Sequence, residues 1–157
     1  MAQKEIITSI GVYKYDELGC GERAVVDEAR KATFRAYAPY SKFCVGAAIL
    51  LDNGEIITGS NQENVAYPSG TCAERTACFY AHAQFPGAQF KTIAIAARDT
   101  SGEEVAKPIS PCGSCRQALL EYEMLAKNDI KVILVGRDEI YTLKSIKSLL
   151  PLAFSEF

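Results

Sequence analysis

Three cysteines at the starts of two predicted helices constrain this chain more than any other feature of its sequence. Cys72 follows Thr71 where a polar loop gives way to a helical segment, and Cys112 and Cys115 belong to a Pro-Cys-Gly-Ser-Cys segment before another helix. A CxxC pair at a helix start places both sulfurs on one side of the first turn. The unpaired N–H groups and the positive dipole end of a helix favour thiolates. We therefore expect a fold in which two helix N-termini meet.

The three sulfurs form a suitable ligand set for zinc. Zinc binds thiolates in tetrahedral geometry, and three protein ligands plus a water are typical of catalytic sites, whereas four protein ligands are typical of structural sites. The single histidine, His82, lies almost three turns along the helix from Cys72, too far away to bind the same ion. Cys20, Cys44 and Cys78 are expected to be small buried residues. If one of them were a fourth ligand, the site would be structural.

Glu74 favours a catalytic site over a structural one. It lies two residues after Cys72, close to the metal without being needed as a ligand, so it can take a proton from the water that zinc acidifies. A glutamate that forms a capping box with Thr71 is the alternative, and the two roles are compatible. Three thiolates leave the zinc site with a net negative charge. Arg75 and Arg116 each follow a ligand cysteine closely and are expected to hydrogen-bond to the thiolates and offset that charge, unless they are ordinary surface arginines.

The hydrophobic pattern predicts alternating strands and helices. A hairpin turn is expected at Asp52-Asn53-Gly54, and N-caps are expected at Thr71 and Ser110, with Pro111 as the first helical residue. This alternation predicts an α/β fold, a three-layer α-β-α sandwich around a mixed sheet of about five strands, in one domain over residues 1–157. Strands are expected at 43–51, 55–59, 91–97, 131–136 and 139–143, with an irregular one within 6–15. Helices are expected at 23–37, 72–84 and 111–126, with a last turn at 145–149.

Composition narrows the class of protein. The 17 basic and 19 acidic residues and a pI of about 5.5 argue against a partner such as a nucleic acid, which a basic surface would recognise. No long apolar run or signal peptide is apparent, so we expect a cytoplasmic protein with no membrane partner. In that reducing compartment, the six cysteines are expected to be thiols or metal ligands rather than disulfides.

The segments Cys72-Ala73-Glu74 and Pro111-Cys112-Gly113-Ser114-Cys115 resemble the zinc motifs of the small homotetrameric zinc-dependent cytidine deaminases. Zinc deaminases combine a ligand, one further residue, a non-ligand glutamate and a later PCxxC segment. Those two zinc motifs are shared by the whole deaminase superfamily, whereas the loop that begins at Asn61 and the C-terminal stretch narrow the resemblance to nucleosides. The matching stretches are Thr71-Cys72-Ala73-Glu74-Arg75, Pro111-Cys112-Gly113-Ser114-Cys115-Arg116-Gln117, Tyr40-Ser41-Lys42-Phe43, Val45-Gly46-Ala47-Ala48, Asn61-Gln62-Glu63-Asn64, Tyr67-Pro68 and Leu149-Leu150-Pro151-Leu152-Ala153-Phe154.

The resemblance implies hydrolytic deamination of cytidine, and of 2′-deoxycytidine, to uridine and ammonia in pyrimidine salvage. It implies one zinc ion per subunit and a homotetramer with shared active sites. The implied zinc ligands are Cys72, Cys112 and Cys115, and the implied proton-transfer residue is Glu74. By the same resemblance, Asn61 and Glu63 contact the ribose hydroxyls, and Phe43 packs against the pyrimidine. The main chain around Ala73 recognises the base edge, and Tyr67 and Phe154 contact the active site of a neighbouring subunit.

Two alternatives remain at this point. One is a zinc deaminase for another base, such as an antibiotic nucleoside, a nucleotide or an RNA base. The acidic composition argues against the phosphorylated substrates and RNA, which call for a basic channel. The other is an interaction domain with a structural zinc, which predicts four protein ligands and no open site.

Overall fold

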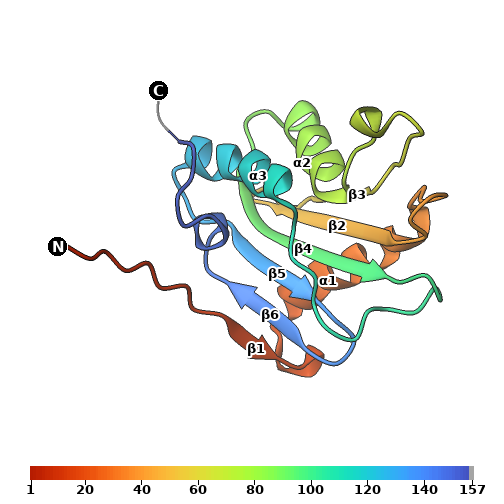
Figure 1. Cartoon of the computed structure of the whole chain (residues 1–157), viewed down its shortest axis with the longest axis horizontal. Helices are drawn as coiled ribbons and strands as arrows, with labels where there is room; N and C mark the ends of the chain where they lie inside the picture. The colour runs from red at the N-terminus through yellow and green to blue at the C-terminus, as the bar shows by residue number, and fades with distance from the viewer. Residues whose placement is uncertain (156–157) are drawn as a thin grey trace.

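A mixed β-sheet runs through the centre of the computed structural model, which describes residues 1–155 (Figure 1). Its strand order is β1-β6-β5-β4-β2-β3. Strands β4 and β5 run parallel, while the other neighbouring pairs are antiparallel. The strands are β1 (Gly11–Tyr13), β2 (Cys44–Leu51), β3 (Ile56–Ser60), β4 (Phe90–Arg98), β5 (Lys131–Val135) and β6 (Ile140–Leu143).

Helices cover both faces of this sheet. Helix α1 (Cys20–Ala32) packs on one face, whereas α2 (Ala73–Gln84) and α3 (Gly113–Ala126) lie on the other (Figure 1). Because successive strand residues point to opposite faces, Ala48 of β2 joins the core under α1, while Ala47 and Ile49 join the core under α2 and α3. The expected three-layer α/β fold is therefore confirmed. Short 3₁₀ turns complete the chain: η1 (Tyr15–Glu17), η2 (Thr33–Arg35), η3 (Tyr67–Ser69) and η4 (Ile146–Leu149).

Several boundaries differ from the expected ones. The sheet has six strands rather than about five, because the N-terminal residues of β1 pair antiparallel with β6. The first helix begins at Cys20, where the Glu22 carboxylate accepts a hydrogen bond from Gly19 N and so closes the first turn. That helix ends at Ala32 and continues as the 3₁₀ turn η2.

The expected N-caps are wrong by one and two residues. Cys72 and Cys112 cap α2 and α3, with extended backbones at φ −76° and −66°, in place of Thr71 and Ser110. Neither cysteine side chain makes a capping hydrogen bond. Both sulfurs are therefore free to face a metal ion rather than the helix backbone.

Close contact between α2 and the sheet fixes the depth of the helix that begins at Cys72. A Cβ atom on Gly59 of β3 would lie 2.5 Å from Ala73 O and 2.5 Å from Ala77 N. Only a glycine lets the backbones approach this closely.

Of the helices within residues 1–155, none combines the length and the apolar character that crossing a bilayer requires.

Candidate functional site

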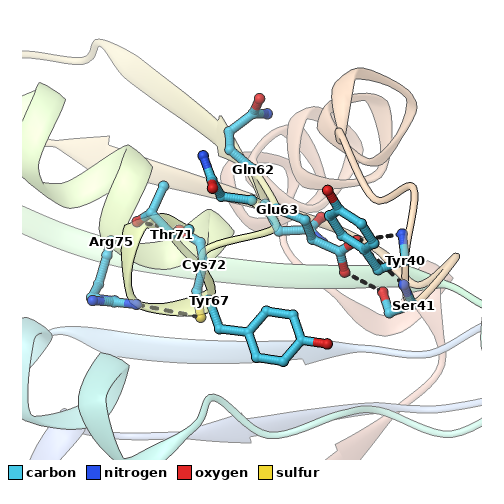
Figure 2. A pocket seen from close by; sticks show the side chains of 11 residues that line it. Tyr40, Ser41, Gln62, Glu63, Tyr67, Thr71, Cys72 and Arg75 are labelled. Carbon is cyan, nitrogen blue, oxygen red and sulfur yellow. Dashed lines mark hydrogen bonds between the residues drawn. The ribbon is translucent and has the colours of Figure 1, made fainter.

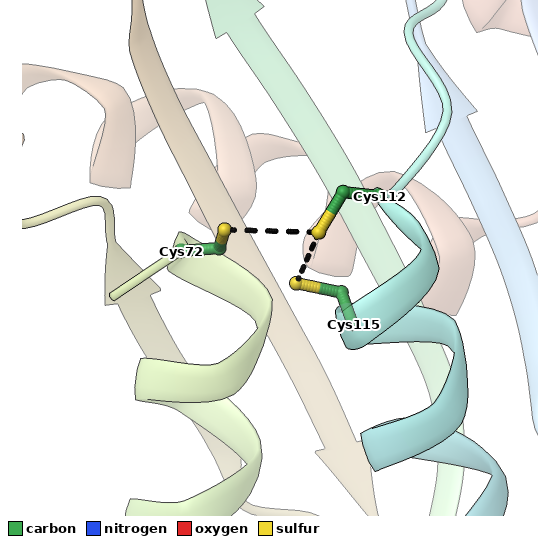
Figure 3. A group of neighbouring side chains, drawn as sticks. All are labelled: Cys72, Cys112 and Cys115. Carbon is green, nitrogen blue, oxygen red and sulfur yellow. Dashed lines mark hydrogen bonds between the residues drawn. The ribbon is translucent and has the colours of Figure 1, made fainter. Parts of the chain in front are cut away.

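The N-termini of α2 and α3 meet at the three cysteines, as the sequence predicts (Figure 3). The sulfur of Cys112 lies 3.9 Å from that of Cys72 and 3.5 Å from that of Cys115. All three sulfurs lie within 4.8 Å of one another. Tetrahedral zinc with Zn–S bonds of about 2.3 Å requires sulfur separations of about 3.8 Å. The observed spacing therefore fits one zinc ion held by three thiolates, with the fourth coordination position left to a water.

The pKa shifts of two of these thiols also fit a site that binds a divalent cation. Hydrogen bonds from Cys115, Arg75 and Cys112 lower the pKa of the Cys72 thiol to about 5. In contrast, the pKa of the Cys115 thiol is strongly raised, first by its hydrogen bond to Cys72 and then by burial. One thiolate opposes the ionisation of the next when the sulfurs are this close. A bound zinc ion removes that conflict, since metal ligation stabilises all three thiolates together.

Glu74 lies in the first turn of α2 and is 4% exposed. Burial raises the pKa of its carboxyl above the ordinary value, and the neighbouring Cys72 thiolate raises it further. Within residues 1–155, the group of side chains able to hold a metal contains the three cysteines without Glu74. A buried carboxyl with a raised pKa beside a metal is suited to accept and release a proton during a reaction.

The two arginines beside the ligands make different contacts. Arg75 donates from Nη2 to Cys72 Sγ at 3.9 Å, in line with the expected support of a thiolate. The expected hydrogen bond from Arg116 to a thiolate is wrong. Its Nε, Nη1 and Nη2 atoms instead donate to oxygens of Pro111, Leu149 and Ser110, at 2.8, 2.9 and 2.8 Å. Arg116 therefore joins the loop before Cys112 to the C-terminal segment, because three backbone or hydroxyl oxygens surround its guanidinium.

A cavity of about 560 Å³ opens beside Cys72 (Figure 2). Two loops line it, one around residues 40–41 and the other from residue 61 to the start of α2. Of the residues expected to contact substrate, the cavity contains Asn61, Glu63 and Tyr67. Its lining residues are Tyr40, Ser41, Asn61, Gln62, Glu63, Asn64, Tyr67, Gly70, Thr71, Cys72 and Arg75.

Asn61 and Glu63 are held in place by hydrogen bonds that leave part of each side chain free. Asn61 Oδ1 accepts a hydrogen bond from Val45 N at 2.8 Å, and Nδ2 donates one to Phe43 O at 2.9 Å. Glu63 Oε2 accepts hydrogen bonds from Tyr40 N and Ser41 N. Amide and carboxylate groups offer more hydrogen-bonding positions than these bonds use. Both side chains can therefore bind a hydroxyl group in the cavity.

Three residues with expected substrate roles lie outside the cavity lining. Phe43 is partly buried at the end of the 40–43 loop, and Ala73 is fully buried at the start of α2. Phe154 is 69% exposed, and its carbonyl accepts a hydrogen bond from Gln117 Nε2 at 2.8 Å. The roles of these three residues stay predictions.

The remaining cysteines and the histidine lie away from the sulfur cluster. Cys78 is buried, and burial raises the pKa of its thiol to about 12. Cys44 is partly buried, whereas Cys20 is exposed, so the expectation of burial is wrong for Cys20. The His82 ring lies 5.3 Å from that of Tyr122. As expected, no fourth cysteine or histidine joins the cluster among residues 1–155.

Sequence reasoning missed the part that Ser41 plays in the site. Ser41 Oγ donates to Glu63 Oε1 at 2.5 Å and accepts from Phe43 N at 3.0 Å. A serine before a strand is an ordinary loop residue in the sequence, and its partner lies 22 residues away. The sequence feature that could have indicated this role is the position of Ser41 in the Tyr40-Ser41-Lys42-Phe43 stretch. The hydrogen bond to Glu63, however, depends on how the chain folds.

Comparisons of the sequence agree with this geometry. Residues 21–128 match the family model described as the cytidine and deoxycytidylate deaminase zinc-binding region. The cytidine deaminase of Sporosarcina psychrophila is 42% identical over 132 residues, which is 84% of this chain and 90% of that protein. The cytidine deaminase of Halalkalibacterium halodurans is 39% identical, over 83% of this chain and 92% of that protein.

Comparisons of the structure lead to the same family. The crystal structure of cytidine deaminase from Burkholderia pseudomallei is similar, with a TM-score of 0.71 and 38% identity over 83% of this chain and 97% of that one. The cytidine deaminase from Mycobacterium tuberculosis has a TM-score of 0.65 and 34% identity over 86% and 98% of the two chains. By its matched zinc-binding region, its relatives and its fold, this chain belongs to the zinc-dependent cytidine deaminase family.

Proposed function

We propose that this chain catalyses the zinc-dependent hydrolytic deamination of cytidine to uridine and ammonia, as an enzyme of pyrimidine salvage. The observation that carries the proposal is the combination of three ligand sulfurs with a buried glutamate outside the ligand set. A site with three protein ligands keeps a position for water, and a structural zinc site has none. Cys72, one of the three sulfur ligands, lines the cavity, so a substrate bound there lies beside the metal site.

The reaction adds water at C4 of the cytosine ring and removes the amine. When bound, zinc supplies a Lewis acid that lowers the pKa of a water molecule towards neutrality. The Glu74 carboxylate accepts a proton from that water and delivers it to N3 of the ring. Glu74 then accepts the remaining proton of the added water, from the hydroxyl now bonded to C4, and transfers it to the amine as the C4–N bond breaks and ammonia leaves. The raised pKa of Glu74 suits both halves of this role, because the group must hold a proton between the two steps.

Asn61 and Glu63 are proposed to bind the sugar. Both line the cavity, and each keeps a hydrogen-bonding position beyond the bonds that anchor it. Glu63 accepts from a sugar hydroxyl, while the second N–H of Asn61 donates to one. A single hydroxyl can satisfy both side chains, so we expect 2′-deoxycytidine to be a substrate as well as cytidine.

The base and the neighbouring subunits complete the proposal. Phe43 is proposed to flank the pyrimidine, and the main chain around Ala73 to read the base edge. Tyr67 and Phe154 are 82% and 69% exposed, so both side chains are accessible to another subunit. We propose that they contact the active site of a neighbouring subunit in a homotetramer.

All six cysteines are free thiols, which is consistent with a cytoplasmic enzyme.

An absorbance assay tests this function. Purified protein is mixed with cytidine or 2′-deoxycytidine, and the conversion of the cytosine chromophore to uracil is followed before and after metal removal. We expect turnover that disappears with zinc and returns when zinc is added. Cys112→Ser should lose zinc and activity, whereas Cys44→Ser, outside the cluster, should keep both. If zinc-loaded protein turns over neither nucleoside, the proposed function is wrong.

A further inference from the structure

A tight turn at residues 38–42 lies directly beside Glu63 at the edge of the cavity (Figure 2). Lys42 N donates to Ala38 O at 3.1 Å and closes this turn. Lys42 itself has a positive φ of 58°, a conformation that is uncommon for a residue with a side chain. The turn directs the backbone N–H groups of Tyr40 and Ser41 towards the Glu63 carboxylate.

Ser41 makes two hydrogen bonds to this carboxylate. Its backbone N donates to Oε2 at 3.3 Å, and its hydroxyl donates to Oε1 at 2.5 Å. Tyr40 N donates to Oε2 as well, at 2.9 Å. The Ser41 hydroxyl is held in turn, because its oxygen accepts a hydrogen bond from Phe43 N. Figure 2 shows the Ser41 side chain directed at the Glu63 carboxylate.

These contacts determine which position on Glu63 stays open. Each carboxylate oxygen accepts about two hydrogen bonds. Oε2 already receives two N–H groups, whereas Oε1 receives the Ser41 hydroxyl and has one position left. The pKa of the Glu63 carboxyl is lowered, chiefly by the Ser41 hydroxyl, so the group stays an ionised acceptor.

We propose that Ser41 is a positioning residue for sugar recognition: it orients the Glu63 carboxylate so that one lone pair of Oε1 faces the substrate. The inference rests on the proposed function, since it assumes a nucleoside in the cavity. Ser41 then acts through Glu63 and has no contact with the sugar of its own.

Ser41→Ala tests this role. We expect the KM for cytidine to rise about tenfold, the effect of losing one hydrogen bond to a charged group, with kcat changed less than twofold. Ser41→Thr keeps the hydroxyl and should restore KM. Ser101→Ala is the matched control, because Ser101 Oγ donates to Asp99 Oδ1 at 2.5 Å on a turn outside the cavity lining, and it should leave both constants unchanged.

A nucleoside without the 2′- and 3′-hydroxyls separates the positioning of Glu63 from general damage to the cavity. The inhibition constant of 2′,3′-dideoxycytidine, measured against cytidine, should be the same for Ser41→Ala and the unsubstituted enzyme. An equal loss of affinity for this analogue would mean that Ser41 shapes the cavity as a whole, and would overturn the proposal. Unchanged KM for cytidine in Ser41→Ala would overturn it too.

A double-mutant cycle tests whether Ser41 acts through Glu63. In a Glu63→Ala background, Ser41→Ala should change the KM for cytidine less than twofold. A further tenfold rise in that background would show that Ser41 contacts the substrate independently. Deamination of cytidine by the unsubstituted enzyme separates the two hypotheses: its absence refutes the proposed function, whereas its presence without any effect of Ser41→Ala refutes only the positioning role.

Discussion

The two walls of the cavity are built in different ways. The metal wall comprises the N-termini of α2 and α3, of which Cys72 and Arg75 line the cavity, and its proposed acid–base residue, Glu74, is almost fully buried. The loop wall comprises the loops at residues 40–41 and 61–71, which are held by hydrogen bonds between side chains and backbone, such as those of Asn61. We therefore expect catalysis to depend on groups that packed helices hold in position. We expect substrate affinity to depend on loop side chains that individual hydrogen bonds hold in position.

The largest effect is expected on the metal wall. Glu74→Gln keeps the size of the side chain but removes its ability to accept a proton, so kcat for cytidine should fall about a thousandfold. Zinc content should stay the same, because Glu74 is outside the sulfur cluster. Steady-state kinetics and metal analysis of the same sample measure both quantities.

The exposed Glu121 on α3 provides a control for that substitution. Glu121→Gln removes the same charge without touching the site and should leave kcat unchanged. Near-normal turnover in Glu74→Gln would assign the proton transfer to another group and would end the functional distinction between the two walls.

An effect of intermediate size is expected for Gly59→Ala, which tests whether packing against the sheet positions the metal wall. Gly59→Ala places a Cβ atom 2.5 Å from the backbone of Ala73 and Ala77, which cannot rotate away. We expect a loss of about 1–3 kcal/mol in the free energy of unfolding, as for other overpacked cores. Helix α2 must shift, and kcat should fall because Cys72 and Glu74 move with it.

Urea denaturation and kinetics measure these two changes, with Gly87→Ala as the control. A Cβ atom on Gly87 would have no neighbour within 4 Å. If Gly59→Ala lowers stability but leaves kcat intact, the metal wall is positioned by its own cysteines and zinc rather than by the sheet.

The same contrast explains what the sequence could and could not predict. The cluster of Cys72, Cys112 and Cys115, with Glu74 in the first turn of α2, was predictable because short spacings place these residues at helix starts. The three-layer fold was predictable because apolar periodicity determines the strands and helices. Helix starts were displaced by one or two residues, since the cysteine backbones themselves take the extended N-cap conformation.

Long-range contacts were not predictable. Arg116 was expected to donate to a thiolate because it adjoins Cys115, but Leu149 O, 33 residues away, occupies its Nη1 atom. The sixth strand, β1, depends likewise on pairing between the two ends of the chain. Neighbours in the sequence gave no sign of either partner.

The smallest effect is expected on the loop wall. Asn61→Ala removes the donor that we propose binds the sugar, and we expect the KM for cytidine to rise about tenfold with kcat changed less than twofold. Asn53→Ala is the control: Asn53 Oδ1 accepts a hydrogen bond from Glu55 N at 3.0 Å, in the turn between β2 and β3. That control loses the same kind of bond outside the cavity and should leave KM unchanged. A fall in kcat as large as that of Glu74→Gln would mean that Asn61 aligns the reacting base itself, because binding lost equally from substrate and transition state changes KM and leaves kcat almost unaffected.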